Sequence, residues 1–300
     1  MQEIDTFLVT DDEALLRLDK LLASRLPHCS RSYFQYLISE GAVLVNGQSA
    51  KKSTVLSVGD EIEVQFILTA EISLEPENIP LDILYEDEHI LAINKPAGLV
   101  VHPAAGNWSH TFVNALLFHC KNLEKDETLR PGIVHRLDKE TSGVLVAAKT
   151  RAMHHALSAL FSQRKVEKRY LALCHGKVGD ILIDQPIGRH LVRRKEMAVT
   201  PTGRPAKTHV RLVKCFGSYS LIDILLETGR THQIRVHLKH VGHPLIGDSL
   251  YGNSQDLKRF GITRQMLHAE SLSFVHPVTG SLLVIKAPLA HDMARLAGLE

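Results

Sequence analysis

The chain has 300 residues, 44% of them hydrophobic, so it can bury one large core or a small domain together with a larger one. Its 35 lysines and arginines nearly balance 33 aspartates and glutamates, which excludes binding to a polyanion through bulk charge and calls for local basic patches instead. Four scattered cysteines exclude a zinc ribbon and a disulfide framework, and no apolar run is long enough to span a bilayer, so we expect a cytoplasmic protein that makes no contact with a membrane.

Residues 1–70 carry the pattern of a small α+β domain. Leucines at helical spacing predict a helix that stops at Pro27, and Ser30 is expected to cap a second helix. The apolar run 43–45 enters Asn46-Gly47, which is a strong signal for a hairpin turn, and residues 62–64 alternate as a strand.

This segment also carries cations, among them Arg31 and Lys51. Its pattern R-L-D-K-L-L, then S-R-S, then G-x-V-x-V-N-G resembles the S4 domain, a small RNA-binding module. The resemblance implies RNA binding through residues such as Arg31 and Lys51. The alternative is an accessory domain whose charges are merely solvated.

Residues 71–80 are polar, acidic and proline-bearing, and we expect them to link this domain to a larger one at 81–300. In the larger domain helices are expected at 111–120 and 151–161. Short strand patterns occupy 81–85, 90–94, 98–101, 169–174, 208–214, 219–226, 272–275 and 282–286. Strands and helices do not alternate regularly, so the pattern favours an α+β fold with a mixed, mainly antiparallel sheet and flanking helices.

A first candidate site is His135-Arg136-Leu137-Asp138, which follows the strand-like residues 132–134 and precedes a long apolar run. Partial burial is expected for Asp138, and a buried carboxylate must be neutralised, paired or used chemically. The alternative is a structural pair of Arg136 with Asp138 beside a turn.

Two further segments carry candidate residues. Tyr170 opens a strand and offers a flat ring for stacking on a base, although a half-buried core tyrosine is the alternative. Between residues 226 and 238, Thr231 is expected to cap a helix with Ile234 on its apolar face. Arg230 and Arg235 at this transition suit one internal ion pair and one phosphate contact, or they are solvated on a surface helix.

The histidines at 232, 237, 240 and 243 lack the H-E-x-x-H spacing of a zinc site, so no metal is expected. The chain also lacks a Walker A loop, a strand-linked G-x-G-x-x-G and a G-x-S-x-G elbow. A basic loop that includes Arg193 and Arg194 is a candidate for phosphate contacts, or it serves only solubility.

Taken together, the motifs resemble the family of pseudouridine synthases that act on ribosomal RNA, most of all its D-type subgroup. The motifs that carry the resemblance, in chain order, are NKPAGLVVHP (94–103), GIVHRLDKETSG (132–143), KRYLALCHG (168–176), ETGRTHQIRVHL (227–238), HPLIGDSLYG (243–252) and LHAESLSFVHPVTG (267–280).

The resemblance implies an isomerase that needs no cofactor and converts uridines of large-subunit ribosomal RNA to pseudouridine. It implies that Asp138 acts at the ribose, as nucleophile or as base, and that Arg235 pairs with it. Tyr170 would stack on the target base and Arg136 would fill the gap that the flipped uridine leaves. Ile234 and Leu272 would form walls of the pocket.

Two alternatives remain open at this point. In the first alternative, the chain is an assembly factor of the ribosome that binds RNA without catalysis. In the second, it is another RNA-modifying enzyme, such as a methyltransferase. No glycine-rich cofactor loop follows an early strand, which disfavours the methyltransferase. No coiled-coil heptad or large apolar stripe demands a dimer, so we expect a monomer.

Overall fold

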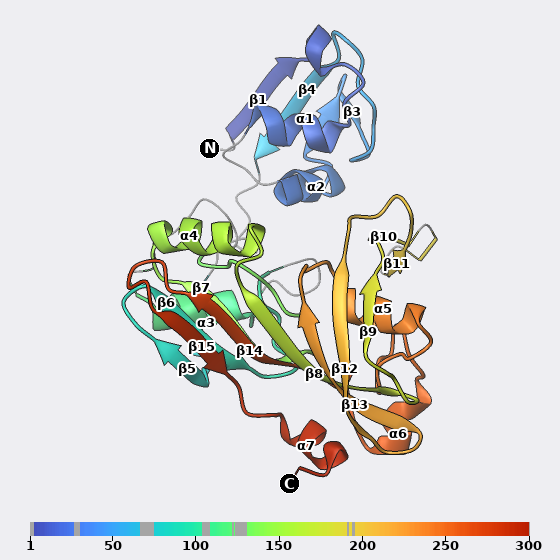
Figure 1. Ribbon diagram of the computed structural model, residues 1–300. Helices are drawn as coiled ribbons and strands as arrows, with labels where there is room; N and C mark the ends of the chain where they lie inside the picture. The colour runs from blue at the N-terminus through green and yellow to red at the C-terminus, as the bar shows by residue number, and fades with distance from the viewer. Residues whose placement is uncertain are drawn as a thin grey trace. The chain divides into compact units, whose positions relative to one another are not determined.

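The computed structural model describes residues 3–26, 31–66, 75–103, 109–121, 123, 131–190, 192–193 and 196–299 (Figure 1). The chain changes from one compact unit to another between Glu75 and Pro76, inside the expected linker 71–80. Pro27 and Ser30, which were expected to stop and to cap helices, lie outside the described residues, as do positions 71–74 of the linker.

The first unit is a small four-stranded sheet with two helices. Its elements are β1 (Glu3–Leu8), the 3₁₀ turn η1 (Asp11–Glu13), α1 (Leu18–Arg25), α2 (Arg31–Ser39), β2 (Val43–Val45), β3 (Gln48–Ser49) and β4 (Glu61–Phe66). The strand order is β1-β4-β2-β3, and leucines of α1 pack with Phe34 of α2 and Ile62 of β4. The predicted helices and hairpin are confirmed; Asn46 and Gly47 both have positive φ, as the turn requires.

The strand β1 was not predicted. Its apolar residues Ile4 and Leu8 are exposed and Phe7 is partly buried against the core, so its apolar residues do not alternate as those of a half-buried strand do. Pairing with β4 defines this strand, from Glu3 opposite Phe66 to Leu8 opposite Glu61. A single sequence does not reveal such long-range pairing.

The second unit is built on a nine-stranded sheet in the order β5-β6-β7-β14-β8-β13-β12-β9, with β15 paired to β14. Its strands are β5 (Ile83–Glu86), β6 (Ile90–Lys95), β7 (Ser142–Ala148), β8 (Glu167–His175), β9 (Ile181–Asp184), β12 (Lys207–Cys215), β13 (Tyr219–Leu226), β14 (Leu267–Val275) and β15 (Leu282–Lys286). A separate pair is formed by β10 (Ile187–Arg189) and β11 (Met197–Val199). Only β14 and β7 pair in parallel among the described strands, so the predicted mixed, mainly antiparallel α+β fold is confirmed.

Five helices accompany these strands in the described part of the unit: α3 (Phe112–His119), α4 (Arg151–Ser162), α5 (Gln233–His240), α6 (Gln255–Phe260) and α7 (His291–Ala297). In α4, Met153 and Leu157 pack against β7 and β14. In α5, Ile234 and Leu238 pack against β8 and β13. None of the helices in the described ranges is long and apolar enough to cross a membrane.

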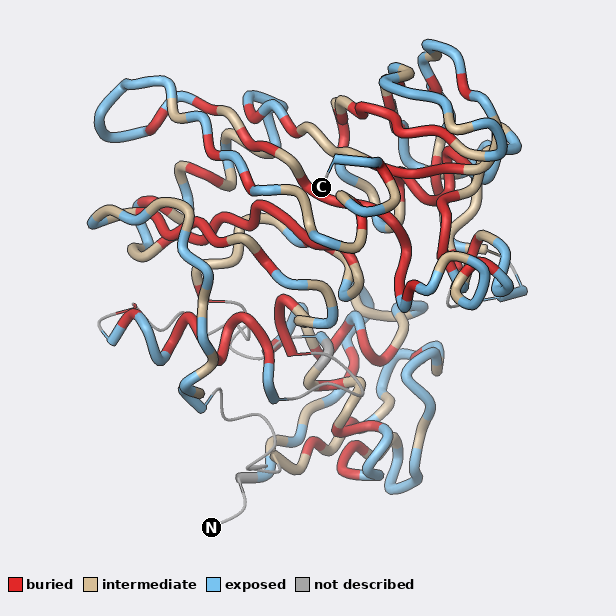
Figure 2. Tube along the Cα trace, turned by 90° about the horizontal axis from the view of Figure 1, so that it is seen from below, coloured by how far each residue is buried: buried red, intermediate tan, exposed pale blue. Residues whose placement is uncertain are grey.

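The strand β7 is buried along its whole length, and it begins directly after the segment that carries Asp138. Buried residues form continuous stretches of the trace, and exposed residues gather mainly in turns (Figure 2). Gly143 lies where β7 meets β14, with φ of 107°. A Cβ atom there would come within 2.1 Å of the Ala269 carbonyl oxygen, so the parallel pairing admits only glycine at this position.

Two predicted strands are wrong. Residues 98–101 form no strand, because Val100 makes only an isolated bridge to Thr111. Residues 132–134 also contribute a single bridge, from Ile133 to Ala147. Asp138 therefore lies in an irregular segment ahead of β7 rather than at the end of a strand.

Candidate active site

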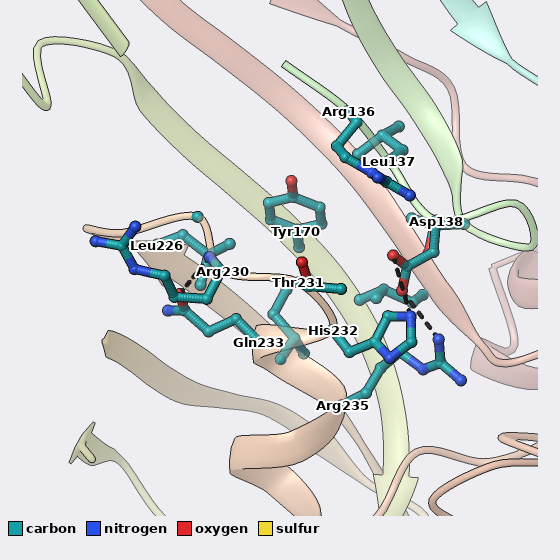
Figure 3. Close-up of a pocket in the computed structure, with 14 residues that line it drawn as sticks. Arg136, Leu137, Asp138, Tyr170, Leu226, Arg230, Thr231, His232, Gln233 and Arg235 are labelled. Carbon is teal, nitrogen blue, oxygen red and sulfur yellow. Dashed lines mark hydrogen bonds and ion pairs between the residues drawn. The ribbon is translucent and has the colours of Figure 1, made fainter. Parts of the chain in front are cut away.

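A pocket of about 120 Å³, open to solvent, lies where four segments of the second unit meet (Figure 3). One segment precedes β7, the second is β8, the third runs from the end of β13 into α5, and the fourth is the start of β14. Its lining comprises Arg136, Leu137, Asp138, Thr141, Tyr170, Leu226, Gly229, Arg230, Thr231, His232, Gln233, Ile234, Arg235 and Leu267. The structure thus brings together six of the predicted site residues, namely Arg136, Asp138, Tyr170, Arg230, Ile234 and Arg235.

The segment around Asp138 is held by its backbone. The Asp138 carbonyl oxygen accepts the Thr141 amide at 3.0 Å, and the Lys139 carbonyl oxygen accepts the Gly98 amide at 2.9 Å. Lys95 is fully buried and donates its Nζ to that same Lys139 carbonyl and to two further carbonyls, those of Pro96 and Leu99. Burial lowers the pKa of Lys95 to about 7.

The Asp138 side chain is 18% exposed, so the expected partial burial is found. Its Oδ2 accepts a hydrogen bond of 3.0 Å from a terminal nitrogen of Arg235 on α5. The guanidinium supplies the counter-charge that a largely buried carboxylate requires. The predicted pair of Asp138 with Arg235 is therefore present, and no ion pair joins Arg136 to Asp138.

A second carboxylate, Asp248, holds the other side of Arg235. Its two oxygens accept Nε and the second terminal nitrogen of Arg235 at 2.7 and 2.9 Å. Asp248 is fully buried and also accepts the backbone amides of Leu250 and Tyr251. Burial acts to raise the pKa of Asp248, but the hydrogen bonds and charge of Arg235 outweigh it and lower that pKa. Burial likewise acts to lower the pKa of Arg235, but the hydrogen bonds and charges of Asp248, and then of Asp138, outweigh it. The pKa of Arg235 is therefore raised.

Asp248 was missed in the sequence. The motif that contains it, HPLIGDSLYG, was recognised only as part of the resemblance. An acidic residue followed by a turn is a weak signal by itself, since such residues commonly satisfy the backbone amides of the turn.

His232 lies on the other side of Asp138. It adopts a left-handed conformation with φ of 56° and stands at the N-cap of α5, so the expected cap at Thr231 is wrong. Its Nε2 is 3.8 Å from Asp138 Oδ1, and its Nδ1 lies 2.8 Å from the Tyr251 hydroxyl oxygen. That hydroxyl oxygen also accepts the Met197 amide at 2.8 Å. Burial lowers the pKa of His232, and the opposing effect of the Asp138 charge does not outweigh it. The ring is therefore neutral at neutral pH.

Tyr170 stands in the pocket between Asp138 and the Arg230 side (Figure 3). It shares a strand face with Ala172 and Cys174, as predicted, and packs in the same cluster. Its hydroxyl makes no hydrogen bond to any residue that the structure describes. Burial, and then the charge of Asp138, raise the pKa of Tyr170, so the hydroxyl stays protonated.

Of the other predicted pocket residues, Ile234 lines the pocket and Leu272 does not. Leu272 is opposite Lys168 and packs in the core beneath α4, with Met153 and Leu157. Leu267, which is opposite Ala172, forms the wall in its place. The prediction of Leu272 is wrong because the pocket lies at the start of β14, whereas Leu272 pairs with Lys168 further along the strand.

The predicted RNA contacts are spread over both units. Arg136 and Arg230 line the pocket, and Arg136 is exposed. Arg31 pairs at 2.7 Å with Asp19, which is fully buried, so part of its charge serves the first unit's own fold. Lys51 is exposed.

Arg193 forms an ion pair of 3.1 Å with Glu196. Arg194 lies outside the described residues.

The histidines near the site serve separate partners. His237 contacts the Thr208 hydroxyl and the Gln185 carbonyl oxygen, and His243 contacts the His175 carbonyl oxygen. Elsewhere in the described residues Glu86, His119 and Cys120 form the one group with the spacing of metal ligands. Lys149 already pairs with Glu86 at 2.8 Å, and a cation at that place disfavours a metal.

Two family models match this chain, one mainly in the second unit and one in the first. Residues 89–240 match the family model of RNA pseudouridylate synthase, and residues 16–62 match the S4 domain. The chain is 44% identical over 300 residues to the ribosomal large subunit pseudouridine synthase D of Xanthomonas campestris pv. campestris, covering 96% of this chain and 90% of that one. It is 46% identical over 295 residues to the protein of the same name from Nitrosomonas europaea, covering 96% and 85%.

Solved structures show the same likeness. Human RNA pseudouridylate synthase domain containing 1 aligns with a TM-score of 0.59 at 26% identity, over 76% of this chain and 88% of that chain. Human RNA pseudouridylate synthase domain containing 4 aligns with the same TM-score at 27% identity, over 72% and 92%.

Proposed function

The chain belongs to the RNA pseudouridylate synthase family, and on that premise we propose that it isomerises uridines of large-subunit ribosomal RNA in the pocket around Asp138. The observation that carries the proposal is the placement of Arg235 between two carboxylates. Asp248 holds the guanidinium, and the guanidinium in turn pairs with Asp138 at the open pocket. Binding alone does not require a desolvated carboxylate of this kind.

The reaction breaks the N1–C1′ bond of uridine, turns the uracil, and joins C5 to C1′. N1 gains a proton and C5 loses one, so no oxidant, reductant or water is consumed. Asp138 attacks C1′ as a nucleophile, or it removes the C2′ proton as a base. Either role needs an ionised carboxylate next to the ribose, which the ion pair with Arg235 supplies.

The target uridine has to leave its stack before Asp138 can reach the ribose. Tyr170 offers its ring as the surface on which the uracil packs, and Ile234 and Leu267 supply apolar walls beside it. Arg136 is exposed at the rim two residues before Asp138, where its guanidinium can stack in the gap left in the RNA.

The substrate proposal rests on the relatives, which are named for the ribosomal large subunit. The S4 domain of the first unit adds an RNA-binding module, with Lys51 as an exposed cation on it. We propose further that the protein works as a monomer in the cytoplasm. Single-stranded loops are the favoured targets because their bases are splayed out at lower cost.

Release of tritium from RNA labelled at uridine C5 tests this function, because C5 loses its hydrogen when it bonds to C1′. The purified chain, incubated with large-subunit ribosomal RNA without cofactor, is expected to release tritium and to form pseudouridine. Tight stoichiometric binding without tritium release would contradict the proposal and support the alternative of an assembly factor. Release of free uracil, by hydrolysis of the N1–C1′ bond, would indicate a different reaction.

A further inference from the structure

His232 presents a hydrogen-bond donor to the pocket, and the groups behind its ring decide which nitrogen carries the hydrogen. The Tyr251 hydroxyl oxygen accepts the Met197 amide at 2.8 Å and lies 2.8 Å from His232 Nδ1. This hydroxyl makes no further hydrogen bond to any residue that the structure describes, and Tyr251 is only 4% exposed. A buried donor left without an acceptor is costly, so the hydroxyl donates to Nδ1. The neutral ring therefore carries its own hydrogen on Nε2.

An acceptor lies beside this donor at the pocket. Asp138 Oδ2 accepts Arg235 at 3.0 Å, whereas Asp138 Oδ1 accepts no hydrogen bond from residues in the described ranges. His232 Nε2 lies 3.8 Å from Oδ1, which is too far for a hydrogen bond between the two atoms. Both side chains line the pocket, and Figure 3 shows the ring next to the carboxylate. The pocket thus contains one donor and one acceptor that do not satisfy each other.

The backbone of His232 is held in a conformation that is costly for a residue with a Cβ atom. Its φ of 56° lies in the left-handed region. Strained residues of this kind gather at binding and catalytic sites, where the surrounding structure compensates for the strain. The His232 side chain makes no capping hydrogen bond to α5, so the helix end does not account for the ring at this position.

One kind of chemical group satisfies both atoms at once. An oxygen between them, at hydrogen-bond lengths of roughly 2.7–2.9 Å, accepts from Nε2 and donates to Oδ1 only if it belongs to a hydroxyl. Uracil has acceptor oxygens and an N–H donor, but no single atom of it does both. Within an RNA strand the 3′ and 5′ oxygens of the ribose are esterified. The 2′-hydroxyl is therefore the one free hydroxyl of the target nucleotide.

We propose that His232 Nε2 and Asp138 Oδ1 together bind the 2′-hydroxyl of the target uridine, so that His232 selects ribose over deoxyribose. The proposal rests on the proposed function, from which it takes the target nucleotide. The 2′ oxygen is bonded to C2′, and C2′ is bonded to C1′. Binding this oxygen therefore holds Oδ1 next to both carbons at which Asp138 can act. The same contact distinguishes RNA from DNA at the reacting nucleotide.

Two replacements of His232 separate the pocket donor from the contact with Tyr251. His232→Asn tolerates the left-handed backbone and keeps an acceptor for the Tyr251 hydroxyl, but its shorter side chain has no donor at the position of Nε2. His232→Gln is the conservative replacement, because its longer amide places an N–H near that position. His240→Asn is the matched control, since His240 is exposed on α5 and does not line the pocket. Melting temperatures check that all three variants fold.

Each protein is given an RNA oligonucleotide that the wild type converts, with either a 2′-hydroxyl or a 2′-hydrogen at the target uridine alone. The measured quantity is kcat/KM for pseudouridine formation. We expect His232→Asn to lower it about tenfold on the hydroxyl RNA, as for one lost hydrogen bond, and to leave it unchanged on the 2′-deoxy RNA. His232→Gln is expected to recover most of the loss. His240→Asn should match the wild type on both RNAs.

An equal loss on both RNAs would overturn the proposal, because His232 would then act on the uracil or through the fold. If the 2′-deoxy RNA is not converted, dissociation constants of the two product RNAs, with pseudouridine at the target position, carry the same comparison. The wild type should bind the 2′-hydroxyl product about tenfold more tightly than the 2′-deoxy product, and His232→Asn should bind both alike.

Equal affinities of the wild type for the two products would likewise overturn the contact with the 2′-hydroxyl. Failure of the proposed function gives a different result, because the wild type would then convert no RNA that carries the 2′-hydroxyl.

Discussion

Arg235 binds Asp138 through one terminal nitrogen and Asp248 through its other two, so a single guanidinium joins the pocket carboxylate to a fully buried one. The side-on pair with Asp248 fixes the plane of the guanidinium. The remaining nitrogen then points at Asp138. The ring of Tyr251 lies 5.0 Å from the guanidinium carbon and closes one face.

The variant Asp248→Asn tests this arrangement. The amide keeps one oxygen for the turn amides but removes the charge that holds Arg235, so we expect kcat to fall by about 10- to 100-fold with little change in RNA affinity. Single-turnover rates and binding titrations measure the two quantities separately. Asp256→Asn is the control, because Asp256 is equally buried but contacts His175 instead of Arg235. Equal rates for both variants and the wild type would contradict this role of Asp248.

The variant Arg235→Lys tests the fork itself. A lysine carries the same charge but cannot bind two carboxylates in the plane of a guanidinium. We expect kcat to fall by about 100-fold, with the protein still folded. Circular dichroism and the same single-turnover assay check both statements, and a rate near that of the wild type would show that charge alone suffices.

The variant Tyr251→Phe tests how His232 is held. It removes the hydroxyl that His232 Nδ1 and the Met197 amide share, and we expect stability to fall by about 1 kcal/mol and kcat to fall several-fold. Tyr219→Phe is the matched control, because that hydroxyl donates to the Leu296 carbonyl oxygen away from the pocket. A similar loss of stability with unchanged kcat is expected for the control. Identical kinetics for the two variants would exclude a role of Tyr251 at the site.

Lys95 gives a pH-dependent prediction. Its pKa is about 7 in the folded protein and 10.5 ordinarily, so between these values the unfolded chain binds the proton more strongly. The stability from this group is therefore fully present above pH 10.5 and is lost as the pH falls toward 7. Lys95→Met is expected to flatten that rise of unfolding free energy with pH. It should also destabilise the chain by roughly 1–3 kcal/mol, because three buried carbonyl oxygens lose their donor.

Denaturant titrations at several pH values between 7 and 10 measure this effect. Lys177→Met, at an exposed position after β8, is the control and should keep the slope of the wild type. An unchanged slope in Lys95→Met would mean that Lys95 is protonated to the same extent in both states.

Much of this architecture was readable from local patterns. The helix carrying Ile234 and Arg235, the strand face of Tyr170 and the hairpin at Asn46 follow from periodicity and turn chemistry, and the structure confirms them. The pairing of Asp138 with Arg235 came from the motif resemblance. It joins residues 97 positions apart, which spacing alone does not reveal.

The rest depended on tertiary packing. Asp248 became visible only once its loop was placed against Arg235, and His232 took the cap position because its left-handed backbone turns the chain into α5. Leu272 is outside the pocket because it lies further along β14 than Leu267, which forms the wall.

We propose that Asp138 performs the chemistry at the ribose, and the variant Asp138→Asn removes the charge that this role needs. Its single-turnover rate of tritium release from C5-labelled ribosomal RNA should fall by about 10³-fold or more, while RNA affinity stays within a few-fold of the wild type. Asp12→Asn, at an exposed position of the first unit, should react like the wild type. Tritium release by Asp138→Asn at the rate of the wild type would contradict the account.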